Sequence, residues 1–329
     1  MLPKGKHNCI IDVAGVKVGH VTLHEKIHKD EMVCTGVTAI LPHSGNLFLE
    51  KVRAASYVIN GYGKTSGLVQ LEELGLLESP IMLTNTFSVG SVLEGTLQYM
   101  LKQTPAIGDT TSSINIVVGE CNDSYLNTMR IQAIKPRHAV MAIERAEHKP
   151  VPEGAIGAGK GMICFGYKGG IGTSSRIVTV GERDAYTIGC LVLSNFGQRH
   201  EASFANWETT HTPTTDGSIM MIIATDAPLY DRQLKRLAKH CTVGLSRTGS
   251  NIHHGSGDIA IAFSTANTYK HDTQTHIESM HFLREDHPVM NQLFQAVAET
   301  TEEAIYRSLL TAETTTGRKG RIVKKAPLS

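Results

Sequence analysis

The sequence lacks any apolar run that is long enough to cross a membrane. Its most apolar stretch, from Ile219 to Ala224, is far shorter than the ~20 residues that span a bilayer. The first residues, MLPKGKHNCIIDVAGVKVGH, hold no apolar signal-peptide core and no small-residue cleavage site. We therefore expect a cytoplasmic protein that does not use a membrane.

The sequence also lacks an excess of charge of either sign. There are 32 Lys and Arg residues against 31 Asp and Glu, which gives a formal net charge of +1. No global field is present to attract nucleic acid or an anionic membrane. Hydrophobic residues make up 41% of the chain and charged residues only 19%, so a folded domain with a substantial core is expected.

Several motifs for metals, nucleotides and common hydrolases are missing. The six cysteines form no CxxC pair and mostly stand in apolar runs such as IVVGEC, which favours buried, reduced thiols. There is no HExxH and no GxSxG. A P-loop-like stretch begins at Gly154, but Gly161 stands where a Ser or Thr would hold Mg²⁺.

The hydrophobic patterns that are present predict mixed secondary structure. Strands are expected at residues 35–41, 113–120, 186–194, 218–225 and 258–265. The last three are long apolar runs, which indicates a sheet that is buried on both faces. Helices are expected at 89–102, with Ser88 as the N-cap, and at 229–241 and 291–313. Without strict βαβ alternation, a layered α+β fold is favoured. The basic tail, TTTGRKGRIVKKAPLS, is expected to be a solvated end.

One segment, residues 245–268, carries a pattern with possible chemistry. A polar, glycine-rich connection containing Gly249 and Ser250 joins the helix that is expected to end near Cys241 to a buried strand. By itself a Gly–Ser pair most often marks a turn. Ser256 and Asp258, however, are separated by one residue where the strand starts, so both side chains point to one face. A carboxylate and two serines can handle protons.

Blocks of sequence along nearly the whole chain match one family. They include GVKVGHVTL, SPIMLTNTFSVG, GMICFGYKGGIGTSSR and TGSNIHHGSGDIAIAFSTAN, in this order. The chain resembles the L-aminopeptidase/D-esterase (DmpA-type) family of self-processing N-terminal nucleophile serine peptidases, which includes β-aminopeptidases. The resemblance implies a four-layer αββα sandwich, a fold that ornithine acetyltransferases share. It also implies one domain that cleaves itself into a large chain, 1–249, and a small chain, 250–329.

The resemblance makes Ser250 both the nucleophile and the new N-terminus. The cut would fall between Gly249 and Ser250, where the hydroxyl attacks the preceding carbonyl. Such an attack needs a strained and accessible peptide, and glycine tolerates that geometry because it lacks a Cβ. The freed α-amine has an unperturbed pKa of roughly 7.7–8.0, so modest burial would let it act as the base near pH 7.

Other family positions carry over one at a time. Asn195, in LSNFG, and Tyr125, in NDSYLN, match residues that stabilise the oxyanion. Lys168, in GYKGGIG, matches a lysine that lines the nucleophile's pocket. Ser256 and Asp258 match a polar pair that orients the nucleophile. Replacing Asn195 by alanine is expected to spare folding but to cost at least about a hundredfold in rate.

The function that the resemblance implies is a serine aminopeptidase acting through an acyl-enzyme. Its substrates would be short peptides, amides or esters with a free amine, which Glu120 could bind. No metal or organic cofactor is needed, and a homo-oligomer, a tetramer of processed protomers, is expected. Two alternatives remain: a related amide-oligomer hydrolase, and a non-catalytic, unprocessed protein that binds amino compounds or assembles.

Some properties stay open at this level. The preferred N-terminal residue and its L, D or β configuration depend on the shape of the pocket. Whether the chain is processed at all is also open. His253 and His254 depart from the family pattern, which has small or amide residues before GSGD, and their effect beside the nucleophile is not predicted.

Overall fold

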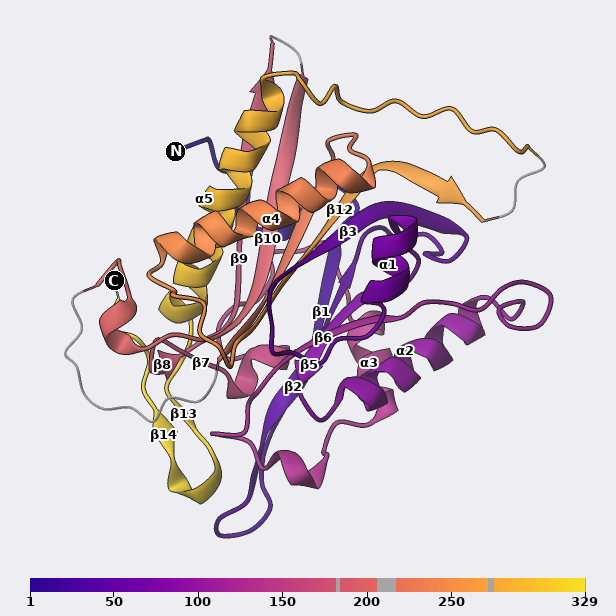
Figure 1. Ribbon diagram of the computed structural model, residues 1–329. Coiled ribbons are helices and arrows are strands. Elements are labelled where there is room, and N and C mark those ends of the chain that lie inside the picture. Colours follow the sequence, from indigo (N-terminus) through magenta and orange to yellow (C-terminus); the bar gives the residue numbers. More distant parts are fainter. Residues whose placement is uncertain (182–183, 206–216, 272–274, 329) are drawn as a thin grey trace.

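The computed structural model describes residues 1–181, 184–205, 217–271 and 275–328, and in this part of the chain two main sheets lie between helices (Figure 1). The smaller sheet has the order β1-β2-β5-β6. Its strands are β1 (Lys17–Lys26), β2 (Met32–Leu41), β5 (Ile81–Asn85) and β6 (Val117–Cys121). β5 and β6 are parallel, and the other pairs are antiparallel.

The larger sheet has the order β4-β3-β12-β11-β10-β9. Its strands are β3 (Glu50–Gly61), β4 (Leu76–Leu77), β9 (Gly170–Val180), β10 (Asp184–Asn195), β11 (Ser218–Thr225) and β12 (Gly257–Lys270). Only β11 and β12 pair in parallel among them. Two short hairpins lie outside the main sheets: β7 (Ile163–Cys164) with β8 (Tyr167–Lys168), and β13 (Thr315–Thr316) with β14 (Ile322–Val323).

Helices form the two outer layers. α2 (Val89–Gln103) and α3 (Pro136–Glu144) pack on the smaller sheet, and α4 (Asp231–Arg247) and α5 (Val289–Leu310) pack on the larger one. The short helix α1 (Leu68–Leu74) contacts β3 and β4. The order of layers is therefore helix, sheet, sheet, helix, and the expected αββα sandwich is confirmed. No helix in the described residues is long and apolar enough to cross a membrane.

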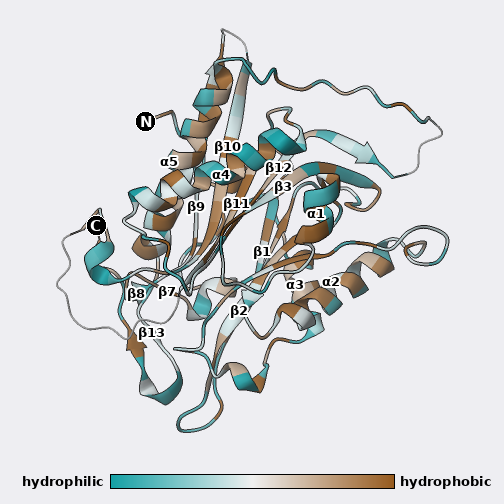
Figure 2. Cartoon of the chain, in the orientation of Figure 1, coloured by the Kyte–Doolittle hydropathy of each residue, from teal (hydrophilic) through white to brown (hydrophobic). Residues whose placement is uncertain are grey.

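The alternation of side chains along the central strands explains why the sheets stack. Along β11, Ile219, Met221 and Ile223 join the core beneath α4 and α5, whereas Met220 and Ile222 join the core between the two sheets. β10 and β12 divide their side chains in the same way. Since both faces are buried there, the central stretches of these strands, 188–193, 219–224 and 259–263, contain no polar side chain, and Figure 2 shows this band of hydrophobic residues in the middle of the molecule.

Several expected boundaries shift in the structure. The strand expected at 113–120 begins only at Val117, although Ile114 and Ile116 still face the core beneath α2 and α3. The preceding backbone bonds to side chains instead: Asn115 N–H donates to Glu78 Oε1 at 2.7 Å. Helix α4 continues to Arg247 rather than ending near Cys241, and Gly244 lets it approach α5, because a Cβ there would lie 2.5 Å from the Ala298 carbonyl oxygen.

The C-terminal tail is not a solvated end, so that expectation was wrong. Residues of the tail form the β13–β14 hairpin, and Val323 and Ala326 are buried. Lys168 N–H donates to the Lys324 carbonyl at 2.9 Å, and Arg318 N–H donates to the Leu126 carbonyl at 2.8 Å. Two-residue strands have no hydrophobic period, so the sequence pattern could not predict this hairpin.

Candidate active site

The ends of neighbouring strands bring most candidate residues to one edge of the larger sheet. Asn195, the last residue of β10, pairs with Ser218, the first residue of β11. Ser218 pairs in turn with Gly257, the first residue of β12, and Ser218 Oγ accepts the Gly257 N–H at 3.1 Å. Asn195 and the end of the loop that carries Ser250 therefore lie at the same edge.

The loop between α4 and β12 holds Ser250 in an unusual backbone conformation. Gly249 has φ +101°, and a Cβ on it would lie 1.7 Å from the Glu201 carbonyl oxygen. Ile252 has φ +53°, which is strained for a β-branched residue. Ser250 is partly exposed, and its Oγ accepts the Ile252 N–H at 3.3 Å. The residues on both sides of the Gly249–Ser250 peptide are thus partly exposed, the backbone is strained two residues further on at Ile252, and no side chain fits at Gly249.

Ser256 and Asp258 form the pair that the sequence predicts. Ser256 Oγ donates to Asp258 Oδ1 at 2.5 Å, and both side chains are buried. Burial raises the pKa of Asp258 to about 6, although the bond from Ser256 acts in the opposite direction. The other oxygen, Asp258 Oδ2, is buried and has no hydrogen-bond partner among the described residues. Asp258 Oδ2 thus accepts no hydrogen bond from the described residues.

Asn195, at the end of β10, connects the larger sheet to the smaller sheet and to the β7–β8 hairpin through the two ends of its amide. Nδ2 donates to the Asn122 carbonyl at 3.0 Å, and Oδ1 accepts the Ile163 N–H at 2.9 Å. Asn122 follows β6 of the smaller sheet, and Ile163 begins β7. The side chain is 2% exposed, so its orientation is fixed. One of the two Nδ2 hydrogens remains after the bond to Asn122.

Lys168 is completely buried and surrounded by carbonyl groups. Its Nζ donates to the carbonyls of Gly159, Met162 and Gly169 at 2.9, 2.6 and 2.7 Å. Three acceptors match the three N–H groups of an ammonium, whereas burial lowers the pKa of Lys168 to about 7. The side chain thereby fixes the backbone at Met162, next to Ile163, which Asn195 holds.

Tyr125 lies beside the hairpin that β7 and β8 form. Its ring is half-buried, and the Arg321 guanidinium lies 4.4 Å from the ring centroid. Tyr125 lines a cavity of about 300 Å³ together with Ile163 of β7 and residues of β8 and β14. Tyr125 and Asn195 thus both adjoin Ile163.

Glu120 lies on the smaller sheet, near the start of β12. It accepts the Lys64 N–H at 2.9 Å and also bonds the Thr86 hydroxyl. A Cβ on Gly63 would be 3.7 Å from Glu120 Oε1 and 3.5 Å from the Gly257 Cα, so only a glycine separates this carboxylate from β12. Glu120 is 4% exposed.

The structure does not join all the candidates into one network. Within the described residues, the hydrogen bond of the Ser250 hydroxyl stays inside its own loop, and none reaches Asn195, Tyr125 or Lys168. His253 Nε2 lies 2.7 Å from Glu201 Oε1, whereas His254 is exposed and faces Tyr62. No group of three or more His, Cys, Asp or Glu side chains in the described ranges is arranged to hold a metal ion.

Sequence reasoning missed two residues that hold the loop. Asn60 Nδ2 donates to the carbonyls of His253 and His254, each at 3.1 Å. Glu201 Oε1 accepts from Asn251 Nδ2 at 3.0 Å. Both residues come from distant parts of the chain, and neither stands in a pattern that singles it out.

The helix–sheet–sheet–helix sandwich, with a serine in the loop before a central strand, is the arrangement that the resemblance to N-terminal nucleophile aminopeptidases implies, and comparisons with known proteins show the same class. The model of peptidase family S58 matches residues 8–323. The chain is 39% identical over 350 residues to a β-peptidyl aminopeptidase, BapA, of Sphingosinicella microcystinivorans, covering 98% of this chain and 86% of the relative.

Two solved structures show the same similarity in three dimensions. The PH0078 protein from Pyrococcus horikoshii OT3 is 50% identical, with a TM-score of 0.92, and the match covers 99% of this chain and 93% of that one. An L-aminopeptidase D-Ala-esterase/amidase from Ochrobactrum anthropi, a prototype for the serine aminopeptidases and a variant among the Ntn hydrolase fold, is 32% identical. Its TM-score is 0.90, with 99% and 93% of the two chains covered.

The chain therefore belongs to peptidase family S58 and is a serine aminopeptidase. The family resemblance, the fold class and the general function expected from the sequence are confirmed. The non-catalytic alternative is not favoured. The individual roles of the site residues and the cut itself remain predictions.

Proposed function

We propose that the protein matures by cutting its own chain between Gly249 and Ser250. The Ser250 Oγ attacks the Gly249 carbonyl carbon, the C–N bond to Ser250 breaks, and the hydroxyl proton passes to the released amine. Water then hydrolyses the ester, which leaves a Gly249 carboxylate and a free Ser250 hydroxyl. The observation that carries this proposal is the accessible Gly249–Ser250 peptide, with left-handed backbone at Gly249 and at Ile252.

The mature site then works as an aminopeptidase. Ser250 Oγ attacks the carbonyl of the substrate's first residue, and the free α-amine of Ser250 takes the hydroxyl proton and passes it to the leaving amine. Water resolves the acyl-enzyme. After the cut, the large chain ends at Gly249 and the small chain begins at Ser250, so the single domain consists of two chains, 1–249 and 250–329.

Neighbouring residues each take one role. Asn195 offers its remaining Nδ2 hydrogen to the oxyanion, and Tyr125 adds its hydroxyl on the side of Ile163. The Asp258 carboxylate accepts a hydrogen bond from the Ser256 hydroxyl, so the Ser256 oxygen is oriented to accept a hydrogen bond from Ser250. Lys168 keeps the Met162 backbone in place beside Asn195.

The substrates are short peptides, amides or esters with a free amine at the N-terminus. Glu120 is the residue that would bind the amine, because it is a buried carboxylate beside the start of β12. The activity of the BapA relatives on β-peptidyl substrates supports the acceptance of β-residues here as well.

The protein is also proposed to form a homo-oligomer, a tetramer of processed protomers. Exposed apolar side chains from contacting elements support an interface: Val58 and Tyr62 at the end of β3, and Val69 and Leu74 on α1. Light scattering on the purified protein would test the mass. The six cysteines all lie in the described residues as buried free thiols, which supports the cytoplasm as the compartment.

A panel of p-nitroanilides tests the activity. β-Alanine, L-alanine and D-alanine p-nitroanilides are compared with their N-acetylated counterparts on the wild-type protein and on Ser250→Ala. The proposal expects turnover of at least one free-amine substrate by the wild type, with the acetylated form and the variant inactive. Equal turnover of the acetylated form would remove the free amine from recognition and would favour an amidase of different specificity.

A further inference from the structure

The cavity of about 300 Å³ beside Tyr125 is lined by two cationic side chains. One is Arg199, the first residue of the short turn η4 (Arg199–Glu201) after β10, and the other is Lys324, which directly follows β14. Among the described residues, no Asp or Glu side chain lines this cavity. A cavity with charges of one sign favours a ligand of the opposite sign. The cavity is therefore suited to an anionic group.

The C-terminal tail adds positive charge around the same cavity. Residues 314–328 contain five Lys and Arg residues and no Asp or Glu. Arg321 Nη1 donates to the Tyr125 carbonyl at 3.0 Å, and Arg318 Nη1 donates to the Ser124 carbonyl at 3.4 Å. These bonds hold the tail against the segment that carries Tyr125, and Figure 1 shows its hairpin, β13 and β14, next to β7 and β8. The basic sequence of the tail is thus a fixed part of the cavity's surroundings.

Both cations that line the cavity are anchored. The Arg199 guanidinium lies 4.3 Å from the centroid of the Tyr167 ring, and its Nη2 donates to the Gly166 carbonyl at 3.2 Å. The backbone of Lys324 is held because its carbonyl accepts the Lys168 N–H at 2.9 Å. A guanidinium carries five N–H donors in one plane, and this geometry matches the two oxygens of a carboxylate.

The cavity and Glu120 lie at different strands of the same sheet edge. Ile163, which lines the cavity, donates its N–H to Asn195 at the end of β10, whereas Glu120 lies beside the start of β12. β11 separates these two strands, so they are about 10 Å apart at a spacing of ~4.8 Å between neighbours. An extended peptide spans at most about 3.3–3.6 Å per residue, so two or three residues bridge this distance.

We propose that this cavity binds the free α-carboxylate of a short peptide whose N-terminal amine is bound by Glu120. The leaving residue lies beside Ile163, and its carboxylate contacts Arg199 and Lys324. The preferred substrates are therefore dipeptides and tripeptides with both termini free, rather than amides, esters or longer chains. The inference rests on the proposed aminopeptidase site at Asn195 and Glu120, and it does not depend on the cut in the chain.

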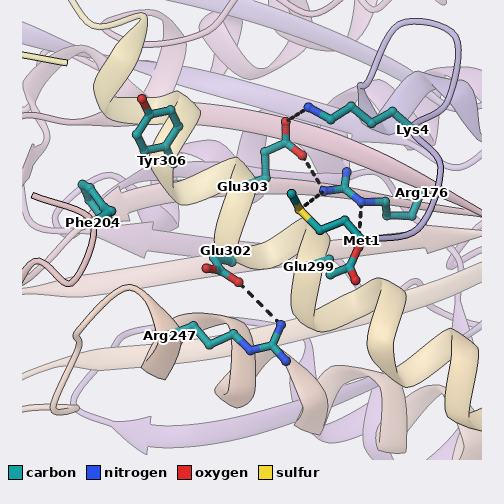
Figure 3. Close-up of a pocket in the computed structure, with 9 residues that line it drawn as sticks. All are labelled: Met1, Lys4, Arg176, Phe204, Arg247, Glu299, Glu302, Glu303 and Tyr306. Carbon is teal, nitrogen blue, oxygen red and sulfur yellow. Dashed lines mark hydrogen bonds and ion pairs between the residues drawn. The ribbon is translucent and has the colours of Figure 1, made fainter. Parts of the chain in front are cut away.

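The larger cleft beside α5, of about 430 Å³, lacks this excess of positive charge (Figure 3). Each Lys or Arg of the described residues that lines it is paired with a glutamate of α5: Lys4 with Glu303 at 2.6 Å, Arg176 with Glu299 at 3.0 Å, and Arg247 with Glu302 at 3.5 Å. Lys4→Gln therefore serves as the matched control for Lys324→Gln, because it removes one lysine charge from a different cleft.

The test compares two substrates that differ only at the C-terminus. One is a dipeptide that ends in L-alanine, the other ends in L-alaninamide, and both begin with the residue whose p-nitroanilide the wild type hydrolyses fastest. Release of alanine or alaninamide is measured by liquid chromatography. The wild type is expected to show a kcat/KM for the acid at least about tenfold above that for the amide, because charged donors form the stronger hydrogen bonds with a carboxylate.

The acid-to-amide ratio of kcat/KM is the quantity compared among the variants. Arg199→Gln and Lys324→Gln should each lower it at least about threefold, Arg199→Lys should keep part of it, and Lys4→Gln should keep all of it. Both substrates are measured on one preparation, so a loss of folded or mature protein affects them equally and leaves the ratio unchanged. Lys324 is exposed, so its variant stays informative even if Arg199→Gln does not fold.

The outcomes separate this inference from the proposed function. Turnover of both dipeptides by the wild type with equal kcat/KM would overturn the carboxylate subsite and leave the aminopeptidase site intact. A preference for the acid that neither Arg199→Gln nor Lys324→Gln lowers, or that Lys4→Gln lowers equally, would show that the carboxylate binds elsewhere and would also overturn it. A wild type that hydrolyses no substrate with a free amine would overturn the proposed function and this inference together.

Discussion

Replacing Asn195 by alanine affects two properties that the structure allows us to separate. The amide satisfies the Ile163 N–H and the Asn122 carbonyl, so its removal leaves two backbone groups without their partner. Each unsatisfied buried group costs about 1–3 kcal/mol, so the two together cost about 2–6 kcal/mol in the free energy of unfolding. At roughly 2–4 °C per kcal/mol, the melting temperature should fall by roughly 4–24 °C. The expectation that this variant spares folding is therefore revised.

The second effect is on the rate. The remaining Nδ2 hydrogen of Asn195 is the proposed oxyanion donor, and loss of one such donor costs about 10²–10³-fold in kcat. Turnover of an alanine p-nitroanilide is measured per mole of chain that begins with Ser250, counted by mass spectrometry. This normalisation keeps a fall in processing from appearing as a fall in turnover.

Asn46→Ala provides the control. The Asn46 Oδ1 accepts the backbone N–H groups of Phe48 and Leu49, at 3.0 and 3.1 Å, outside the candidate site. Its loss should lower stability by about 1–3 kcal/mol but change kcat by less than about threefold. A fully active Asn195→Ala enzyme would remove Asn195 from the mechanism. An equal fall in kcat for both variants would mean that the rate effect is structural.

Three further variants test the other parts of the account. Ser250→Ala should abolish cleavage and turnover, and a cut chain in this variant would refute the assignment of the nucleophile. Because the pKa of Asp258 is raised to about 6, wild-type turnover should fall as the pH drops below about 6. Asp258→Asn should turn over substrate slowly and should not show this fall at low pH. The same fall in the variant would exclude Asp258 as its source. For the same group, protonation favours the folded state, so its stabilisation is lost as the pH rises from about 4 through 6, in the wild type but not in Asp258→Asn. In Gly249→Ala the added Cβ clashes with the Glu201 carbonyl oxygen, so most of the chain should remain uncleaved on a gel. Gly108→Ala, also at positive φ but in open space, should cleave normally.

The sequence patterns that span many residues predicted the fold well. β11 was predicted at its observed bounds, and the α5 stripe of Phe294, Val297, Ile305 and Leu309 is buried as expected. These elements are long, and burial in the core determines which of their residues are apolar. The strands β1 and β3 were not predicted, because their exposed ends mix polar and apolar residues.

The site was predictable only where it follows motif or strand spacing. The bond between Ser256 and Asp258 follows from their separation by one residue at the start of β12. The hydrogen bond from Asn251 to Glu201 joins residues 50 positions apart, so no local sequence pattern predicts it. The strained φ of Ile252 likewise depends on tertiary contacts, because the residues around it in the sequence do not predict a left-handed backbone conformation at this position.

The central claim, that Ser250 becomes an N-terminal nucleophile, is tested most directly by intact mass spectrometry of the purified wild-type protein. The account predicts two chains, with the smaller one beginning Ser250-Asn251-Ile252 and ending at Ser329, and no remaining precursor after full maturation. A single mass for all 329 residues in a protein that still hydrolyses aminoacyl p-nitroanilides would contradict it.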